Sequence, residues 1–186
     1  MSSDFVAMRD VVRLIRLCHH RWTIPLLAEL QRTNGGRFAA MANRLGISRD
    51  TLSKTLQDMM KQGWITRNPG YGHPLRPEYI LTAAGKRLGP PCFDLVTALR
   101  RPGIDGIVLN KWSLPVLWAV RHGHDRFASL KAGLPGITPR ALTLALKELQ
   151  EIALIRRTVV DEFPPSTRYT LSRIGEQIAR LAESLT

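Results

Sequence analysis

The sequence lacks any run of about 18 or more apolar residues, and this excludes an ordinary membrane-spanning helix. Its first residues, MSSDFVAMRDVV, carry an acid early and lack the charged start, apolar run and small-residue cleavage site of a signal peptide. Only two cysteines are present, Cys18 and Cys92, and they lie far apart, which suits a reducing compartment. We therefore expect a cytoplasmic protein.

Motifs of the common catalytic sites are missing as well. The sequence contains no nucleophile elbow, zinc-protease helix, phosphate-cradling loop or close carboxylate pair in a plausible cleft. Cys18-His19-His20 and His122-x-His124 lack the further ligands that a metal site requires. We therefore predict no enzymatic activity, no cofactor and no bound metal.

Acidic residues are scarce: 15 Asp and Glu stand against 27 Lys and Arg, for a formal net charge of +12. Such an excess favours an acidic partner, with nucleic acid before a membrane surface. The charge is uneven, since residues 1–101 hold 16 basic and seven acidic side chains, and residues 102–186 hold 11 and eight. Charge alone does not identify the partner, so the prediction of a nucleic-acid partner depends on the sequence motifs.

One stretch of the sequence occurs twice. Residues 46–65 read GISRDTLSKTLQDMMKQGWI, and residues 136–155 read GITPRALTLALKELQEIALI. Each copy opens with a Gly-Ile turn and a hydroxyl residue, Ser48 or Thr138, that can cap a helix. Leucine and methionine then recur at helical spacing, and an apolar pair that can start a strand closes each copy. A one-sided helix between a tight turn and a strand is typical of a DNA-reading helix.

The repeat extends over most of the chain at an offset of 90 residues, with one residue lost before Arg126 and one gained before Gly136. The matched segments are Arg21-Trp22 with Lys111-Trp112, Pro25 with Pro115, Arg37-Phe38 with Arg126-Phe127, Arg67 with Arg157, Tyr79 with Tyr169 and Gly85 with Gly175. We interpret this pattern as a tandem duplication.

The remaining segments complete a winged helix-turn-helix pattern. Residues 5–19 predict an amphipathic helix whose buried stripe is Phe5, Met8, Val12, Ile15 and Cys18. A helix follows from Arg21-Trp22 to Asn34, then a short one over FAAMANRL. The turn-rich residues 65–81 predict a two-stranded wing, and Thr82 caps a helix toward Arg100 with a break at Pro90-Pro91. Residues 95–109, rich in Gly and Pro, predict the joint between the units.

The predicted fold is mainly α with small β wings. It comprises two tandem winged helix-turn-helix units, 1–101 with the N-terminal helix and 102–186, which form an intramolecular pseudo-dimer. The tryptophans Trp22, Trp64 and Trp112 lie within apolar patterns, and we expect them in the core rather than stacked on bases.

Both halves resemble the HxlR family of winged helix-turn-helix transcriptional regulators, which is related to MarR-like regulators. The first half shows RW, RF, GIS, GWITR and PLRPEYILTAAG in order, and the second shows KW, RF, GIT, ALIRR and PPSTRYTLSRIG. The resemblance covers about residues 20–100 and 110–185. It implies DNA binding by two reading helices, which the family supplies from a homodimer joined through terminal helices and this sequence supplies from one chain.

The DNA-contacting residues predicted from these motifs lie on the reading helices, the wings and two helix starts. They are Ser48, Arg49, Asp50, Ser53, Lys54 and Gln57 on the first helix; Thr138, Arg140, Thr143 and Lys147 on the second; Arg67, Tyr71, His73, Arg76, Arg156, Arg157 and Arg168 on the wings; and Arg37 and Arg126 at helix starts, where local packing is an equal alternative.

Cys18 allows two interpretations. It lies between Arg16 and His19-His20-Arg21, and nearby positive charge lowers a thiol pKa. Because some relatives of the resembled family sense oxidants through a cysteine near the first helix, Cys18 is a candidate redox sensor. However, Cys18 does not fall at the family's usual spacing, and a small apolar residue on a helical stripe explains it adequately.

The resulting functional prediction is a sequence-specific transcriptional repressor that binds double-stranded promoter or operator DNA and reads two non-identical half-sites. A first alternative assigns DNA reading to the first unit alone and makes the second a dimerisation or effector module. A second alternative is a ligand-binding protein on a winged-helix scaffold. We further expect nucleoid association, a small-molecule effector and further homodimerisation as features to test, and no membrane partner.

Overall fold

The computed structural model describes residues 3–69, 72, 76–100, 109–161 and 166–186. This part of the chain forms nine helices and two separate two-stranded antiparallel sheets, which confirms the mainly helical fold with small β wings. The chain divides into two compact units. The first unit is His20–Ala98, and the second unit is Leu99–Thr186 together with Met1–His19.

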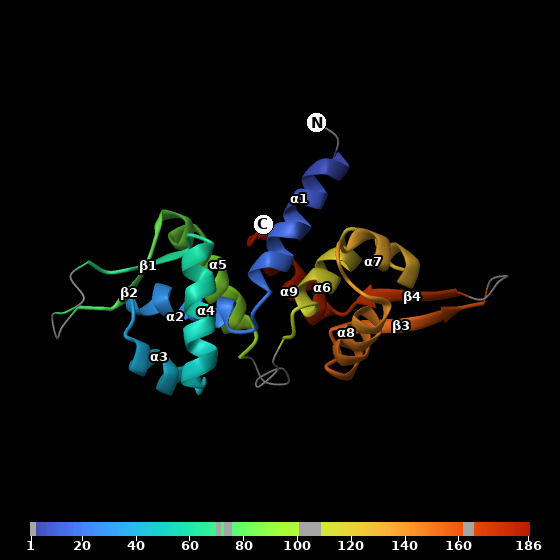
Figure 1. The fold of residues 1–186 in the computed structure, drawn as a ribbon. Helices are drawn as coiled ribbons and strands as arrows, with labels where there is room; N and C mark the ends of the chain where they lie inside the picture. Colours follow the sequence, from blue (N-terminus) through green and yellow to red (C-terminus); the bar gives the residue numbers. More distant parts are fainter. Residues whose placement is uncertain (1–2, 70–71, 73–75, 101–108, 162–165) are drawn as a thin grey trace. The chain divides into compact units, whose positions relative to one another are not determined.

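The first unit contains one complete set of winged-helix elements. In chain order these are α2 (Thr23–Thr33), α3 (Phe38–Leu45), α4 (Arg49–Lys61), β1 (Ile65–Arg67), β2 (Tyr79–Leu81) and α5 (Ala83–Ala98). Helices α2 and α5 pack against each other, and α4 runs beside them with the β1–β2 wing at its end (Figure 1).

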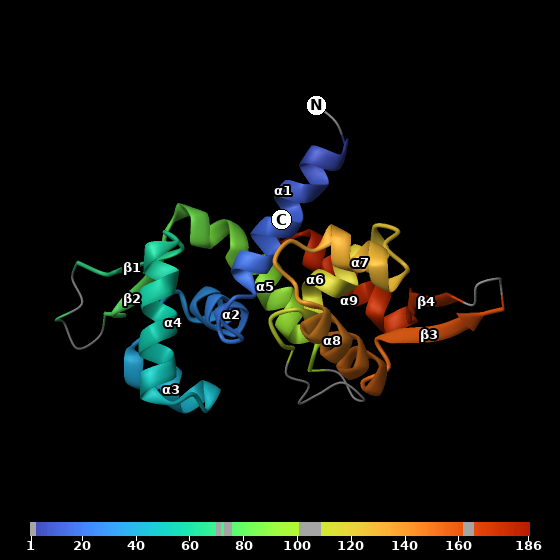
Figure 2. The same ribbon diagram turned by 45° about the vertical axis from the view of Figure 1, so that its right-hand side comes forward.

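The second unit repeats this order and adds one helix. Its elements are α1 (Ser3–Leu17), α6 (Ser113–Arg121), α7 (Phe127–Gly133), α8 (Pro139–Glu151), β3 (Ile155–Val160), β4 (Ser166–Leu171) and α9 (Arg173–Glu183). Helix α6 packs against α9, α8 and α7, so it occupies the central place that α2 holds in the first unit (Figure 2).

Helix α1 differs from its prediction in two ways. It contacts α6 and belongs to the second unit, although its place in the sequence assigned it to residues 1–101. Its buried residues are Val11, Leu14 and Leu17. Of the predicted stripe, Met8 and Val12 are 45% and 38% exposed, Ile15 is half-buried, and Cys18, just past the helix end, is buried as predicted. The side chain of Phe5 lies outside the described residues. The helix carries two apolar stripes, and packing selects the one that periodicity alone did not favour.

Helix α5 corrects a second prediction, because it continues from Ala83 to Ala98 through Pro90 and Pro91. The two prolines remove amide donors, but Pro90 is exposed and Pro91 half-buried, while Cys92 and Leu95 of the following turn are fully buried. Burial of this turn therefore outweighs the missing hydrogen bonds. The predicted joint at residues 95–109 falls largely on residues 101–108, which lie outside the described residues.

A glycine fixes the same contact in each unit. A Cβ added to Gly85 would lie 1.9 Å from the carbonyl oxygen of Trp64, and one added to Gly175 would lie 1.9 Å from that of Leu154. Both glycines are in the first turn of the helix that follows the wing, α5 or α9. The backbone therefore requires glycine at both positions, which explains its repetition at the 90-residue offset.

The repeated basic-tryptophan motif also forms the same structure twice. The guanidinium of Arg21 and the ammonium of Lys111 each lie 5.1 Å from the centroid of the following tryptophan ring, Trp22 or Trp112. These tryptophans are half-buried, as is Trp64, so they lie at the edge of the predicted core, and each ring is partly accessible to solvent. A cation over one ring face leaves the other face to pack inward.

Candidate nucleic-acid interface

Helices α4 and α8 begin in the same way. The turn before each helix uses a glycine with left-handed backbone, Gly46 at φ 61° and Gly136 at φ 78°. The predicted caps are confirmed: Ser48 Oγ accepts a hydrogen bond from the Thr51 amide at 3.3 Å, and Thr138 Oγ1 accepts one from the Ala141 amide at 3.1 Å. The two hydroxyls thereby fix the start of each helix after its turn.

The buried faces of α4 and α8 are equivalent as well. Leu52, Leu56 and Met59 are buried in α4, and Leu142, Leu146 and Leu149 are buried in α8, each 2% exposed or less. Along positions 52–60 and 142–150, aligned residues are equally buried, half-buried or exposed, with one exception. Ser53 is half-buried, whereas the aligned Thr143 is exposed. The solvent-facing arc of each helix therefore consists of the residues predicted from the repeat.

The exposed arc of α4 is polar and carries cations. Arg49, Asp50, Lys54 and Gln57 are exposed, and Ser53 is half-buried. Among the described residues, neither Arg49 nor Lys54 makes a hydrogen bond or ion pair. Both side chains can therefore reach a phosphate or a base edge without breaking an internal contact.

The exposed arc of α8 has a different chemistry. Arg140 and Lys147 provide its cations, and Lys147 forms a 3.8 Å ion pair with Glu151 one turn later. Between them lie Thr143 and Leu144, and Leu144 is 55% exposed. At the position of Arg49, this helix has Pro139, which fits the first helical turn without loss of a hydrogen bond.

In the first wing, the side chain of Arg67 lies against its own hairpin. Arg67 pairs with Tyr79 in the sheet, lies 5.8 Å from the Tyr79 ring centroid and makes a 3.3 Å ion pair with Glu78. Arg76 is exposed before β2. The predicted contacts Tyr71 and His73 lie outside the described residues.

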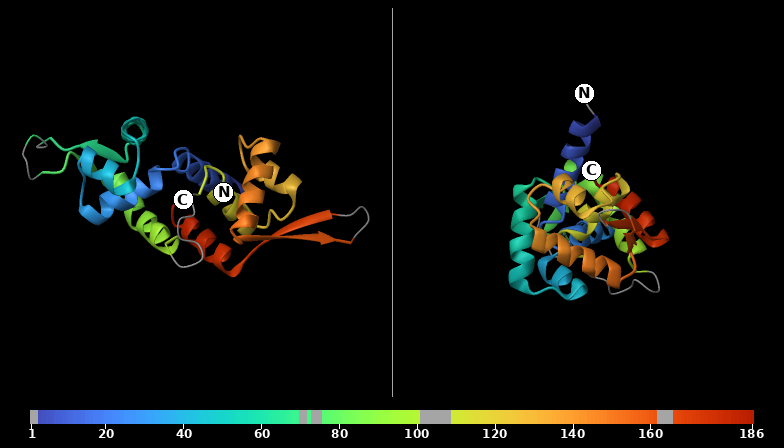
Figure 3. Two further views of the ribbon diagram at one scale, coloured as in Figure 1. Left: turned by 90° about the horizontal axis from the view of Figure 1, so that it is seen from below. Right: turned by 90° about the vertical axis from the view of Figure 1, so that its right-hand side faces the viewer.

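The second wing is longer, with six residues in each strand against three in the first wing. Its register pairs Arg156 with Thr170 and Arg168 with Thr158, which places these two arginines on one face of the hairpin. Arg157 lies on the other face, where its guanidinium donates to Thr167 Oγ1 at 3.3 Å. The β3–β4 hairpin extends as an arm from its helices (Figure 3).

Arg37 and Arg126 occupy equivalent places at the starts of α3 and α7, and both are exposed. The guanidinium of Arg37 donates two hydrogen bonds to the Arg76 carbonyl, at 3.2 and 3.1 Å, which ties α3 to the wing. Arg168 has a comparable anchoring contact, a 3.2 Å ion pair with Asp125 beside Arg126. The predicted phosphate contacts of these arginines remain predictions.

A buried acid within the first unit was not predicted from the sequence motifs. Glu29 of α2 is 8% exposed and forms ion pairs with Arg32, one turn later, and with Arg44 of α3. Its signal in the sequence is an acidic residue inside the apolar run of α2, where the second unit has the fully buried Ala119. The contact to Arg44 joins the central helix to the helix-turn-helix.

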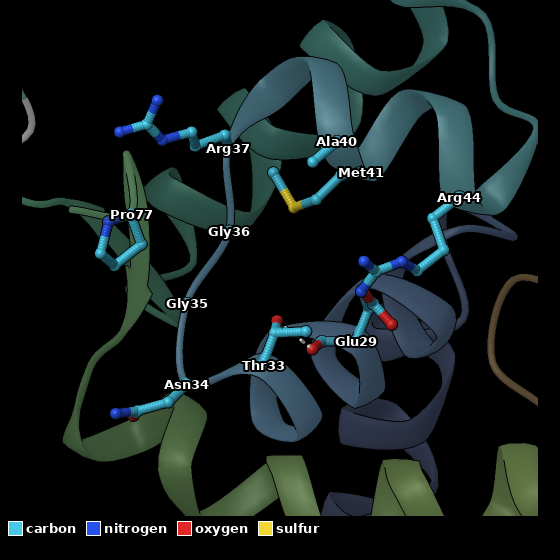
Figure 4. Close-up of a pocket in the computed structure, with 10 residues that line it drawn as sticks. All are labelled: Glu29, Thr33, Asn34, Gly35, Gly36, Arg37, Ala40, Met41, Arg44 and Pro77. Atoms are coloured by element: carbon cyan, nitrogen blue, oxygen red, sulfur yellow. Dashed lines mark hydrogen bonds and ion pairs between the residues drawn. The ribbon is translucent and has the colours of Figure 1, made fainter. Parts of the chain in front are cut away.

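A pocket of about 330 Å³ opens next to this ion pair (Figure 4). The Asn34–Arg37 segment lines one side, and Glu29, Met41 and Arg44 line the other. Burial alone would raise the pKa of Glu29, but the hydrogen bonds and charges of Arg32 and Arg44 outweigh it, so the carboxyl pKa lies below its ordinary value. Glu29 is therefore ionised at neutral pH, and the pocket wall carries paired charges.

The thiol of Cys18 has the opposite character to a reactive thiolate. Cys18 is buried, and burial raises its pKa to about 12. A thiol with this pKa stays protonated at neutral pH and reacts slowly with oxidants. These properties favour the structural interpretation of Cys18 over redox sensing, which remains an untested prediction.

The duplicated winged-helix geometry has a direct counterpart among protein families. The model of the HxlR-like helix-turn-helix family matches this chain twice, over residues 17–99 and 107–186. The chain belongs to the HxlR-like helix-turn-helix family. Two matches in one chain also confirm the tandem duplication, and each match contains one complete helix-turn-helix and wing.

Individual HxlR-like relatives match about half of the chain. An HTH-type transcriptional regulator of Synechocystis is 33% identical over 97 residues, which cover 52% of this chain and 72% of that protein. YtcD of Bacillus subtilis is 33% identical over 42% of this chain and 63% of its own length. A regulator of Methanothermobacter thermautotrophicus is 36% identical over 41% of this chain, and the match spans 58% of the relative.

A solved structure shows the same partial correspondence. A MarR-family transcriptional regulator of Enterococcus faecalis is 33% identical, with a TM-score of 0.39, over 50% of this chain and 78% of that protein.

Among the described residues, no helix is both long enough and apolar enough to cross a membrane.

Proposed function

We propose that this HxlR-like chain binds double-stranded DNA in a sequence-specific manner and regulates transcription. The observation that carries the proposal is the exposed arc of α4, where a capped helix presents Arg49 and Lys54 without internal partners. A helix of this kind fits the major groove, where its N-terminal half reaches base edges. The similarity to HTH-type transcriptional regulators of Synechocystis and Bacillus subtilis supports the same function.

In this proposal α8 is the second reading helix, and the two units act as an intramolecular pseudo-dimer. Two reading helices in one chain serve two half-sites about 34 Å apart, one turn of B-DNA. Because the exposed arcs of α4 and α8 differ, the half-sites are not identical. Binding at a promoter represses transcription by excluding polymerase, and the protein associates with the nucleoid.

Paired substitutions on the two helices test this proposal. Arg49→Ala with Lys54→Ala should weaken binding of a selected duplex about 100-fold, since base-contacting cations contribute about 1–3 kcal/mol each. Arg140→Ala with Lys147→Ala should weaken it about 10-fold, because Lys147 is already paired with Glu151 and Arg140 supplies most of the loss. Lys86→Ala with Arg87→Ala is the matched control, because these exposed α5 residues carry the same charge away from the reading helix. Affinity is measured by fluorescence anisotropy at 50 and 200 mM salt, where phosphate contacts make it salt-dependent.

A second candidate follows from the ion pair of Lys147 with Glu151 and from the exposed Leu144, which reduce the free cationic character of α8. Here only the first unit reads DNA, and the second unit is a dimerisation or effector module. The Arg140 and Lys147 substitutions then leave affinity at the control value. Equal losses for all three variants, including the Lys86 and Arg87 control, would instead indicate binding by net charge without reading helices.

The predicted effector and further homodimerisation belong to the same proposal. The pocket beside Glu29 offers a place for a small molecule that would act on α3 directly. The exposed Met8 and Val12 on α1 offer apolar area to a second copy of the chain. Analytical ultracentrifugation of the free chain shows whether it forms dimers, and the same measurement on the duplex complex gives the number of chains bound to each duplex.

A further inference from the structure

Two exposed residues at the centre of α8, Thr143 and Leu144, form a small apolar strip. Leu144 is 55% exposed, second to Val159 at 60% among the large apolar side chains of the described residues, and it lies at the position that Lys54 occupies in α4. Leu144 differs from a singly exposed apolar residue in its setting, because it lies one helical turn from each of two cations, Arg140 and Lys147, and takes the place of a lysine. It indicates a partner surface that is apolar at one point and negatively charged around it.

Thr143 extends this strip. Its hydroxyl donates a 3.0 Å hydrogen bond to the Pro139 carbonyl one turn earlier, so its polar group is satisfied within the helix. The methyl group is then the part of the exposed side chain that remains available for contact with a partner. The equivalent residue in α4 is Ser53, which has no methyl group, so two adjacent positions change from polar in α4 to methyl-bearing in α8.

Cations flank the strip on the same face of the helix. Arg140 precedes Leu144 by four residues, Lys147 follows it by three, and both are exposed. Among the described residues Arg140 makes no hydrogen bond or ion pair, and Lys147 makes a 3.8 Å ion pair with Glu151 that is exposed on both sides, so a phosphate can replace the carboxylate. Charge on both sides fits the phosphates of a duplex, and the strip between them then faces the base edges.

The major groove presents a single kind of apolar group, the C5-methyl of thymine. We infer that α8 recognises thymine through this methyl group, with Leu144 and Thr143 as the specificity-determining residues. The inference rests on the proposed function and deepens it, because it assigns methyl contacts to the second half-site and hydrogen-bonding contacts to the half-site of α4. The difference between Leu144 and Lys54 thereby becomes a difference in the base that is read.

The test replaces thymine by deoxyuridine, which lacks only the C5-methyl and pairs with adenine in the same way. A duplex selected by the full-length chain is made with each thymine replaced in turn, and affinities are measured by fluorescence anisotropy at one salt concentration. At one or two positions the replacement should weaken binding about fourfold, the effect of losing one buried methyl group. Leu144→Ala should bind the parent duplex more weakly and should lose its sensitivity to deoxyuridine at those positions.

Lys54→Ala is the matched control, because it changes the equivalent exposed residue of the other reading helix and should keep the full fourfold deoxyuridine effect. Thr143→Ser removes only the methyl group and should reduce the effect in part. Circular dichroism checks that each variant folds, as expected for exposed positions. A double-mutant cycle between Leu144 and the thymine methyl gives their coupling directly.

Two results overturn the inference while the proposed function stands. One is specific, salt-dependent duplex binding with no sensitivity to deoxyuridine at any position. The other is a Leu144→Ala variant that keeps the wild-type ratio of thymine to deoxyuridine affinity, as it would if Leu144 served a protein partner. If no duplex is selected at any salt concentration, the proposed function itself fails, and the inference with it.

Discussion

The two units of this chain share their interior and differ at their surface. The turn glycines, helix caps, buried leucines and post-wing glycines recur at equivalent positions with equivalent geometry. The exposed arcs of α4 and α8 share a similar exposure pattern but differ in charge and polarity, since Lys54 aligns with Leu144 and Asp50 with Arg140. Packing restrains the buried positions in both units, whereas the exposed positions were free to acquire different partners.

The ion pairs show the same division. The first unit joins α2 to α3 through the buried Glu29 and Arg44. The second unit has Ala119 at the position of Glu29 and instead joins α6 to α9 through Arg121, Glu176 and Glu183. Each unit therefore connects its central helix to a different neighbour, and in the part of the chain that the structure describes an ion pair from the central helix to the helix-turn-helix occurs in the first unit alone.

The largest expected effect tests what the two units share. Gly85→Ala and Gly175→Ala should each lower the free energy of unfolding by about 3 kcal/mol, because the new Cβ meets a backbone carbonyl that cannot move alone. Urea unfolding followed by circular dichroism measures the loss. Gly72→Ala is the control, since an added Cβ there meets no atom within 4 Å, and it should change little. A tolerated alanine at only one of the two positions would show that the units are not equivalent in their cores.

A smaller effect tests what distinguishes the first unit. Glu29→Gln should lower the free energy of unfolding by about 1–2 kcal/mol at pH 7, because it removes two ion pairs from a buried carboxylate whose partners are half-exposed. The folded-state pKa of Glu29 is lowered, so its stabilisation is present above the ordinary carboxyl value of 4.5 and is lost as the pH falls through the folded pKa.

The advantage of the wild type over Glu29→Gln should therefore shrink between pH 5 and pH 3, measured by urea unfolding at each pH. Asp94→Asn, at an exposed site on α5, provides the control for removing one carboxylate. If the difference between wild type and Glu29→Gln stayed constant with pH, the ion pair would not be the cause of the stability.

The smallest expected effect concerns one turn that the units build from different residues. Gly63 has φ 72° and the equivalent Ala153 has φ 54°, so alanine in the second unit adopts left-handed backbone. Gly63→Ala should destabilise by about 1 kcal/mol, since no neighbour of Gly63 obstructs a Cβ and only the backbone resists it. Ala153→Gly should stabilise by about 0.5 kcal/mol, because relief of strain exceeds the added freedom of the unfolded chain. Opposite signs in thermal unfolding confirm the comparison, and equal signs contradict it.

The sequence was sufficient for features set by local chemistry or by the repeat. Caps at Ser48 and Thr138, the buried leucines of α8 and the order of helices and wings all follow from residue type and spacing. Features set by tertiary packing were not predictable in this way. The choice between the two apolar stripes of α1 and the continuity of α5 through Pro90-Pro91 depend on which neighbouring helix lies against them.

The same limit applies to the candidate site. Periodicity identified the exposed arcs of both reading helices, because burial of one face determines the other. It could not show that Arg37 hydrogen-bonds to the wing or that Glu29 is buried beside Arg44, since these pairs join residues 39 and 15 positions apart. The burial of Cys18, which raises its pKa, likewise depends on residues distant in sequence.

The central claim is that two unlike helices read two unlike half-sites from one chain. The most direct measurement is selection of bound duplexes from random DNA by the full-length chain at two salt concentrations, followed by hydroxyl-radical footprinting of the selected sequence. The account predicts two protected segments about one helical turn apart with different base sequences. A perfect palindrome bound by a single chain would contradict it.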